Sequence, residues 1–541
     1  MEEQQNSKNK SFLQGAVILG FAGIIIKVLG AFFRIPLANI IGDDGMGYYQ
    51  TAYPIYNLFL TLAIAGIPTA IARMVAERTA LDRRYEAHRV FRVSFWLLLA
   101  TGVVTSGILF LFAGPITRAI KEPGAIYCMQ AIAPALLFCP LMSSFRGYFQ
   151  GLQDMRPTAV SQVVEQLFRV AVGLGLAILL LPRGVNIAAA GASFGATAGA
   201  LAGFIGIGFV YLKHRRAILQ EVESGRTTDV ESVKSILKDI LIIAVPITIG
   251  SAVLPVINTI DTAIVKTRLI SVGFDSDTAR ALYGQLTGMA APLLNFPQVL
   301  LQAVSMSIVP VIASAYKRSE TKFMHQNINL AMRYSAILSI PCAVGMSVLA
   351  TPIMLLFYPR VRESAVSAGG CLQILAYGVI FLGMAHALNG ILQGIGKQMI
   401  PVVNLCLGAL VKIFLTYTLT GIPALNVRGA AISTVAAYLT AACLDFRAMM
   451  KFTGTKVDFG LTFGRPAACA AVMGFLVWHI YRLCHSFMGN ALSVVVSICC
   501  GILAYFILIF VFKAITVDEL EGLPKGKKLA AFLRRFQRTE R

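Results

Sequence analysis

The stretch RGYFQGLQDMRP at residues 146–157 contains a pattern that returns later in the chain. Its first half, GYFQG at 147–151, recurs as GILQG at 390–394, an offset of 243 residues. Arg169 and Lys412 repeat this offset, and a proline follows each copy at nearly the same spacing. A near-constant offset across several segments is typical of an internal repeat, which decides the architecture of the chain that contains it.

The composition around this repeat is that of a membrane protein. Of the 541 residues, 57% are hydrophobic and only 13% are charged, whereas soluble proteins have about 25% charged residues. This excludes a soluble enzyme, a disordered chain and a secreted disulfide scaffold. The ten cysteines are scattered, mostly in apolar segments, so we interpret them as packing residues rather than metal ligands or disulfides.

Apolar stretches of roughly 20 residues predict membrane-spanning helices. We count fourteen of them, which predicts an all-α polytopic membrane protein. The predicted spans are Phe12–Ile41, Gly47–Val75, His88–Ala113, Ile126–Leu152, Thr158–Leu181, Ile187–Leu212, Ile236–Val265, Thr278–Ala315, Ile328–Phe357, Ala365–Gln393, Met399–Leu419, Gly429–Met450, Pro466–His485 and Ala491–Phe512.

The basic residues of the loops predict the orientation. With the N-terminus in the cytoplasm, and with the basic residues at several span ends counted in the adjoining loops, cytoplasmic segments hold 31 of the 47 Lys and Arg residues, external segments hold 10, and 6 lie deeper within spans. This excess predicts that both chain ends are cytoplasmic. The net charge of +21 then arises from basic residues at the cytoplasmic membrane surface. We therefore expect this charge to contact anionic lipids rather than nucleic acid.

The repeat pairs the fourth, fifth and sixth spans with the tenth, eleventh and twelfth. Because six is an even number, both copies enter the membrane from the same side, and the repeat is parallel. We therefore predict a first lobe at 1–212, a linker at 213–235, a second lobe at 236–451, and two further helices with a basic tail at 452–541. Two such lobes around a cleft are typical of alternating-access transport.

Charged residues inside a membrane are costly and are therefore candidates for function. Lys27 and Arg34 are seven residues apart, so they share one face of the first helix and could bind one ligand. A cleft rich in basic residues suits an anionic substrate such as a pyrophosphate. The candidate substrate-binding residues are Lys27, Arg34, Arg73, Arg146, Glu165, Arg169 and Lys412.

Structural roles compete with substrate binding at several of these positions. Arg34 and Arg73 could extend to the membrane surface, and for Arg73 this is the favoured interpretation. Arg146 lies beside glycines that permit close helix contact, so it fits a cleft or a structural tie equally well. Glu165 and Arg169 are spaced i, i+4, which predicts an ion pair within one helix.

A carboxylate in the seventh span is a candidate for cation coupling. Asp261 follows Asn258 and Thr259, whose oxygens could join it in holding Na+ or could stabilise a bound proton. We group Asn404 with this set. A cap at the end of the helix is the alternative role for Asp261. The sequence has no phosphate-binding loop and no His-Glu-x-x-His motif, so we expect neither catalytic residues nor a further cofactor.

The stretch at 146–157, continued by SQVVEQLFR at 161–169, resembles the signature of the stage V sporulation protein B group. The segments KVLG at 27–30, IGDDG at 41–45 and GIPTAIARMVAE at 66–77 are similar to the first two helices of that group. The group belongs to the polysaccharide transporter branch of the multidrug/oligosaccharidyl-lipid/polysaccharide (MOP) exporter superfamily, and the resemblance spans the chain.

This resemblance implies a flippase of the bacterial cytoplasmic membrane. It implies that an undecaprenyl-pyrophosphate-linked precursor, with lipid II as the first candidate, moves from the inner to the outer leaflet, as in the MurJ-type flippases. Lys27 and Arg34 fall near the basic positions of the family's first helix, whereas the family's basic residue before the Phe-Pro of helix eight is not evident before Phe296. Coupling to membrane potential and a cation, and contact with cell-wall synthesis proteins, are implied in the same way.

Three other functions remain open at this point. One is a flippase for another lipid-linked polysaccharide precursor. The second is a cation-coupled multidrug exporter, whose cleft for cationic drugs should contain carboxylates and aromatics rather than basic residues. The third is a membrane-embedded glycosyltransferase, which would need carboxylates arranged for catalysis in its external loops. Those loops hold only scattered acidic residues such as Asp43, Asp44, Asp275 and Asp277.

Overall fold

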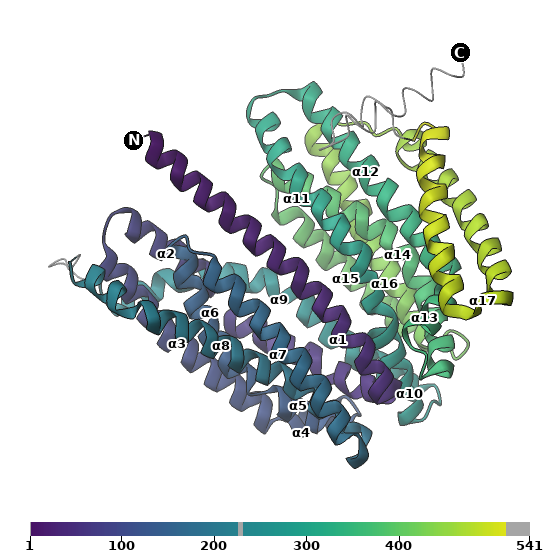
Figure 1. Cartoon of the computed structure of the whole chain (residues 1–541), viewed down its shortest axis with the longest axis horizontal. Helices are drawn as coiled ribbons and strands as arrows, with labels where there is room; N and C mark the ends of the chain where they lie inside the picture. Colours follow the sequence, from purple (N-terminus) through teal and green to yellow (C-terminus); the bar gives the residue numbers. More distant parts are fainter. Residues whose placement is uncertain (1, 225–230, 515–541) are drawn as a thin grey trace. The chain divides into compact units, whose positions relative to one another are not determined.

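The chain folds almost entirely into α-helices (Figure 1). The computed structural model describes residues 2–224 and 231–514, without the side chains of 2–21, 24, 27, 31, 217–219 and 221–224. No β-strand occurs among these described residues, which confirms the predicted all-α class. The central part of the predicted linker and the predicted basic tail, from residue 515 onward, lie outside the described residues.

Twelve stretches of the described chain are long and apolar enough to cross a membrane. Two of them, Val28–Ala80 and Gly460–Val511, are 53 and 52 residues long, and each covers two of the predicted spans. Each of the others overlaps one predicted span. The chain is therefore a multi-pass membrane protein, and the predicted count of fourteen helices is confirmed.

The two long stretches change direction at glycines. Helix α1, Glu2–Ile64, turns at Gly42, where φ is +70° and ψ is −174°. Helix α17, Arg465–Val511, turns at Gly489, where φ is +71° and ψ is 174°, and Figure 1 shows it as two rods joined at that turn. A side chain strongly disfavours this backbone conformation, so glycine allows each pair of spans to fold back without a long loop.

The chain divides into two compact units. The first comprises Met1–Pro292 and Thr416–Val427, and the second comprises Leu293–Leu415 and Arg428–Arg541. This division differs from the lobe boundary predicted at 213–235. Helices α9, Val233–Ser271, and α10, Ser276–Gly284, belong to the second lobe by sequence but pack on α1 in the first unit.

The first unit is built around α1. Helices α7 and α8 run side by side within it, and α6 packs on α2, α3 and α8 (Figure 1). Besides α1, α9 and α10, its helical elements are α2 (Ile67–Ala80), α3 (Arg84–Leu111), α4 (Ala113–Ala119), η1 (Pro123–Ala125), α5 (Ile126–Ile132), α6 (Ala135–Gly151), α7 (Arg156–Leu180), η2 (Leu181–Arg183), α8 (Val185–Ser224) and η3 (Gln285–Ala290).

The second unit packs α11, α12 and α14 against one another, and α17 lies against α12. Ile312, Ile328, Met332 and Ile391 are fully buried in its core. Its helical elements are α11 (Asn295–Lys317), α12 (Thr321–Val348), α13 (Ala350–Phe357), α14 (Arg362–Gly394), α15 (Met399–Leu419), α16 (Val427–Thr453), η5 (Gly460–Gly464) and α17, while η4 (Ala291–Leu294) and the end of α15 lie at the division between the units.

The repeated glycines make equivalent contacts in the two units. In α6, a Cβ atom added at Gly147 would lie 2.9 Å from the Pro68 carbonyl oxygen of α2. In α14, a Cβ atom added at Gly390 would lie 2.7 Å from the Ser305 carbonyl oxygen of α11. Glycine therefore permits close backbone approach at both places. The equivalent of Pro68 by contact is therefore Ser305.

We predict that Gly151→Ala destabilises the protein, because the new Cβ would lie 2.6 Å from Val75 Cβ and 2.8 Å from the Ala72 carbonyl oxygen. Overpacking of this kind costs about 1–3 kcal/mol. The matched control is Gly107→Ala in α3, where the added Cβ meets nothing within 4 Å. Thermal unfolding in detergent measures both variants. Equal or higher stability of Gly151→Ala would contradict the close contact.

Candidate functional site

A row of tyrosines follows the Gly42 turn on α1. Tyr49 and Tyr53 stack with ring centroids 5.6 Å apart, and Tyr53 and Tyr56 are 6.0 Å apart. Phe33, on the other arm of α1, packs 6.1 Å from Tyr49. The spacing of four and three residues places the tyrosines on one helical face, so the turn brings an aromatic row of the second span against the first span.

Two arginines converge on this row. The guanidinium carbon of Arg34, on α1, lies 5.7 Å from the ring centroid of Tyr53, and that of Arg169, on α7, lies 5.2 Å from it. Arg169 Nη2 also donates a hydrogen bond to the Tyr49 hydroxyl at 3.4 Å. Attraction between a cation and an aromatic face holds each guanidinium without neutralising its charge.

Neither Arg34 nor Arg169 forms an ion pair within the described part of the chain. Both are half-buried. Two uncompensated positive charges near one ring, within membrane-spanning helices, form a site for an anion. We name Arg34, Tyr49, Tyr53 and Arg169 the arginine–tyrosine site.

The predicted ion pair between Glu165 and Arg169 was wrong. Glu165 Oε2 instead accepts from Arg146 Nη2 at 2.9 Å, and Arg146 Nε donates to Ser161 Oγ at 2.9 Å. The i, i+4 spacing places Arg169 within reach of Glu165. However, α6 packs beside α7 and supplies the closer guanidinium, that of Arg146. Arg146 is thus a tie between helices, and its pairing leaves Arg169 free of a carboxylate.

The remaining basic candidates lie elsewhere. Arg73 is exposed and pairs with Glu77 on the same helix at 2.8 Å, as its surface interpretation predicts. Lys27 is in α1, seven residues before Arg34, and its side chain is outside the described residues. Lys412 lies on α15 in the second unit, half-buried.

The candidate cation ligands are divided between the units. In the first, Asp261 is buried and its Oδ1 accepts from Thr416 Oγ1 at 3.3 Å, while the Asn258 side chain is exposed. In the second, Asn404 Nδ2 donates to Asp445 Oδ1 at 2.7 Å. Asp445 is 2% exposed and was not among the predicted residues. The described residues contain no group of three or more His, Cys, Asp or Glu side chains that could hold a metal.

A buried ionic cluster of Glu122, Lys266 and Arg280 was not predicted from the sequence. The predicted seventh span ended at Val265, one residue before Lys266, whereas α9 continues to Ser271. Asp275 caps the start of α10, which carries Arg280, and hydrogen bonding to Thr278 lowers the pKa of Asp275 from its usual value. Glu122, Lys266 and Arg280 each lie near the end of an apolar stretch, and this position could have marked them as candidates. They are too far apart in the sequence for their contact to be predicted.

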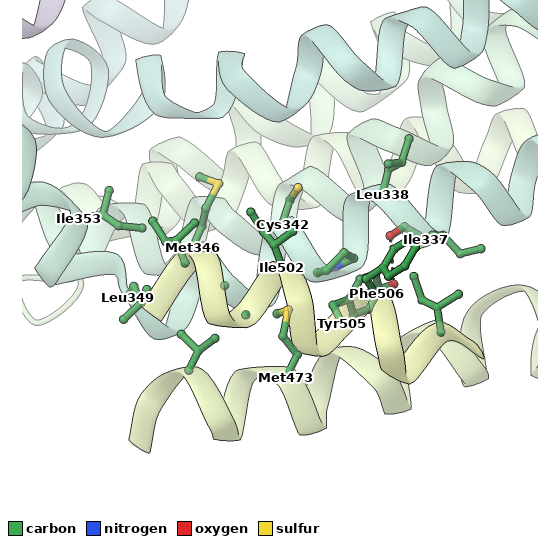
Figure 2. Close-up of a pocket in the computed structure, with 16 residues that line it drawn as sticks. Ile337, Leu338, Cys342, Met346, Leu349, Ile353, Met473, Ile502, Tyr505 and Phe506 are labelled. Carbon is green, nitrogen blue, oxygen red and sulfur yellow. Dashed lines mark hydrogen bonds between the residues drawn. The ribbon is translucent and has the colours of Figure 1, made fainter. Parts of the chain in front are cut away.

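The second unit contains an apolar cavity of about 410 Å³ (Figure 2). Leu338, Cys342 and Met346 of α12 line one side, and Met473 and Ile502 of α17 line the other. The volume is in the range of small-molecule sites, and the walls offer hydrocarbon contact rather than polar recognition. An apolar chain fits this cavity, whereas a charged group does not.

This fold is shared with solved membrane transporters. A solved structure titled "Lipid II flippase MurJ, inward closed conformation" aligns with a TM-score of 0.69 at 15% identity, covering 92% of this chain and 98% of that chain. The family model described as polysaccharide biosynthesis protein matches residues 12–316, and the MatE model matches 287–418. The chain therefore belongs to the polysaccharide biosynthesis protein family.

Curated relatives from Bacillus subtilis (strain 168) match over most of their length. Stage V sporulation protein B is 28% identical, with 95% of this chain and 98% of that protein covered. Lipid II flippase MurJ is 29% identical, with 82% of this chain and 84% of that protein covered. The family resemblance seen in the sequence is thus confirmed.

We predict that Arg146→Met destabilises the protein by up to about 3–5 kcal/mol, because it leaves the Glu165 carboxylate without its cation. The double variant Arg146→Met/Glu165→Gln should recover most of this loss, since no unpaired charge remains. Thermal unfolding in detergent of both variants and of Glu165→Gln forms a double-mutant cycle. A double variant as unstable as the sum of the two single changes would show that the ion pair is not coupled.

Proposed function

We propose that this protein is a flippase for an undecaprenyl-pyrophosphate-linked cell-wall precursor, with lipid II as the leading candidate. The observation that carries the proposal is the arginine–tyrosine site, in which Arg34 and Arg169 face Tyr53 without a carboxylate. A pyrophosphate presents several anionic oxygens, so it can bind both guanidiniums through charge-assisted hydrogen bonds. The flippase named among the relatives supports this class of substrate.

The apolar cavity of the second unit suits the other end of such a substrate. Its lining residues are hydrocarbon or sulfur side chains, with Tyr505 as a polar-tipped exception. An isoprenoid chain gains the hydrophobic stabilisation of burial there and needs no hydrogen bonds. We propose that this cavity takes up an isoprenoid chain.

We propose that transport proceeds by alternating access of two parallel lobes in the bacterial cytoplasmic membrane, with both chain ends in the cytoplasm. Support comes from the repeat, the excess of basic residues in alternate loops and the relatives. Cell-wall synthesis proteins that supply the precursor on the inner side and consume it on the outer side are the expected partners.

The site argues against one of the other candidate functions, the multidrug exporter. A cleft for cationic drugs should offer carboxylates, but Glu165, the acidic residue one turn before Arg169, is neutralised by Arg146. A flippase for a different lipid-linked polysaccharide precursor uses the same pyrophosphate contacts, because the carrier is shared. The pyrophosphate contacts therefore do not distinguish one glycan from another, and a transport experiment is needed to identify the glycan.

That experiment measures lipid II on the outer leaflet of cells depleted of their own flippase and expressing this chain. Restored outer-leaflet lipid II is the expected result. If the protein is present in the membrane and lipid II stays inside, the lipid II assignment is wrong. A screen of other undecaprenyl-linked sugars in the same cells then tests the wider class.

We predict that Arg34→Ala abolishes flippase activity and that Lys27→Ala reduces it, with protein levels unchanged. Each charge-assisted hydrogen bond lost contributes about 1.5–3 kcal/mol, which is roughly 10- to 150-fold in affinity. The matched control is Arg118→Ala, which removes an exposed arginine of the first unit. Growth on each variant as the sole flippase measures the effect, and normal growth with Arg34→Ala would overturn the binding role.

We propose that a cation, Na+ or a proton, couples to transport at Asp261. The carboxylate is buried with a threonine hydroxyl beside it, which is the donor chemistry that Na+ and protons use. Asp261→Asn should therefore change the sodium or pH dependence of transport in reconstituted vesicles. An unchanged dependence on both ions would assign Asp261 a structural role. Asn404→Ala tests the second-unit candidate in the same assay.

A further inference from the structure

One carboxylate in the first unit binds two cations from distant parts of the chain. Glu122, just before η1, accepts from Lys266 Nζ of α9 at 3.0 Å through Oε2 and from Arg280 Nη1 of α10 at 3.3 Å through Oε1. Lys266 Nζ also donates to Thr51 Oγ1 of α1. These contacts tie three segments to α1.

The cluster is buried at its centre and exposed at its rim. The side chains of Lys266, Glu122 and Arg280 are 1%, 3% and 9% exposed. Arg280 continues outward to Asp277 at 2.8 Å and Asp44 at 3.3 Å, whose side chains are 78% and 48% exposed. Each buried charge therefore has an opposite charge within reach, which is the condition for keeping it buried.

The backbone around the cluster is packed too closely for side chains. A Cβ atom added at Gly47 would lie 2.4 Å from Arg280 Cγ, and one added at Gly284 would lie 2.1 Å from the Asp43 carbonyl oxygen. One added at Gly288 would lie 2.8 Å from Met46 Cβ. Asp43 Oδ2 also accepts from Gln285 Nε2 at 2.8 Å. We name this contact of residues 43–51 with 280–288 the seam.

The two sides of the seam belong to different predicted lobes. Residues 43–51 and Glu122 lie in the first lobe by sequence, and Lys266 and residues 280–288 lie in the second. If the lobes separate on this side during transport, the seam must part. In the closed state the charged side chains of the seam pair with one another, and in the open state water would solvate them. Neither state leaves a charge without a partner, so the cluster can stabilise the closed state and still allow the seam to open.

We propose that Glu122, Lys266 and Arg280 form a latch that holds the two lobes closed on the side of the seam. The proposal rests on the proposed alternating-access transport, but it does not depend on which lipid-linked glycan is carried. Glu122 is the central residue because both cations bind it. Its loss leaves Lys266 buried without a carboxylate in the closed state, while water satisfies Lys266 in the open state.

The test reads the opening of the seam without a substrate. Met46 is fully buried in the seam, and Cys is a small apolar replacement for it. In a variant in which the ten native cysteines are replaced, Met46→Cys is labelled with a maleimide in lipid nanodiscs. We expect slow labelling in this background and at least about tenfold faster labelling after Glu122→Gln. Labelling needs no transport, so this outcome is independent of whether lipid II is the substrate.

A second change separates a latch from general damage. Lys266→Met added to Glu122→Gln removes the stranded cation, while Arg280 keeps Asp44 and Asp277. The labelling rate should then fall below that of Glu122→Gln but stay about threefold above the background, because the stranded cation is gone while the latch is still incomplete. The matched control is Glu165→Gln, which removes a carboxylate from an ion pair inside the first predicted lobe and should leave the rate unchanged.

Three results would overturn the latch. They are an unchanged rate after Glu122→Gln, a double variant that labels as fast as that single variant, and equal acceleration by Glu165→Gln. If Glu122→Gln does not fold, the single variant Lys266→Met tests the latch instead. It keeps the Glu122–Arg280 pair and should accelerate labelling by about threefold. A rate equal to the background in that variant would also overturn the proposal.

Discussion

The cost of an unpaired charge inside a membrane organises the first unit. Arg146 and Lys266 would each be expensive alone, and each is neutralised by a carboxylate from another segment, Glu165 or Glu122. Within the described part of the chain, Arg34 and Arg169 have aromatic rings and the Tyr49 hydroxyl against them, and no carboxylate. The structure thus pairs Arg146 and Lys266 with carboxylates but leaves the charges of Arg34 and Arg169 unneutralised. An anionic ligand can bind where these two arginines lie.

The overall architecture followed from the sequence because it depends on local patterns. Hydrophobic length defined the spans, and the glycine pairs of the repeat marked helices that approach other helices at their backbones. Arg34 and Arg169 were selected for the same local reason, as charges in apolar stretches. The turn at Gly42 joins two predicted spans into one continuous element, but it did not alter their number.

Contacts between distant segments could not be predicted in the same way. Glu165 had a suitable partner four residues away, and only the packing of α6 on α7 shows that Arg146 takes it. Glu122 and Lys266 are separated by 144 residues, and no spacing rule relates them. The same limit applies to the units. The repeat divides the chain according to which segments resemble each other in sequence. The units follow contacts instead, and α9 and α10 pack on α1 because glycines and paired charges hold them there.

The arginine–tyrosine site and the latch share two turns of α1. Tyr49 and Tyr53 contact Arg169, while Thr51, between them in sequence, contacts Lys266 on another side of the same helix. A helical segment moves as a rigid body over so short a distance, so an anion that draws Arg34 and Arg169 together also acts on the segment that anchors the latch. If the substrate binds and the latch releases as proposed, a movement of this segment reaches both groups, because the segment is itself in contact with each of them.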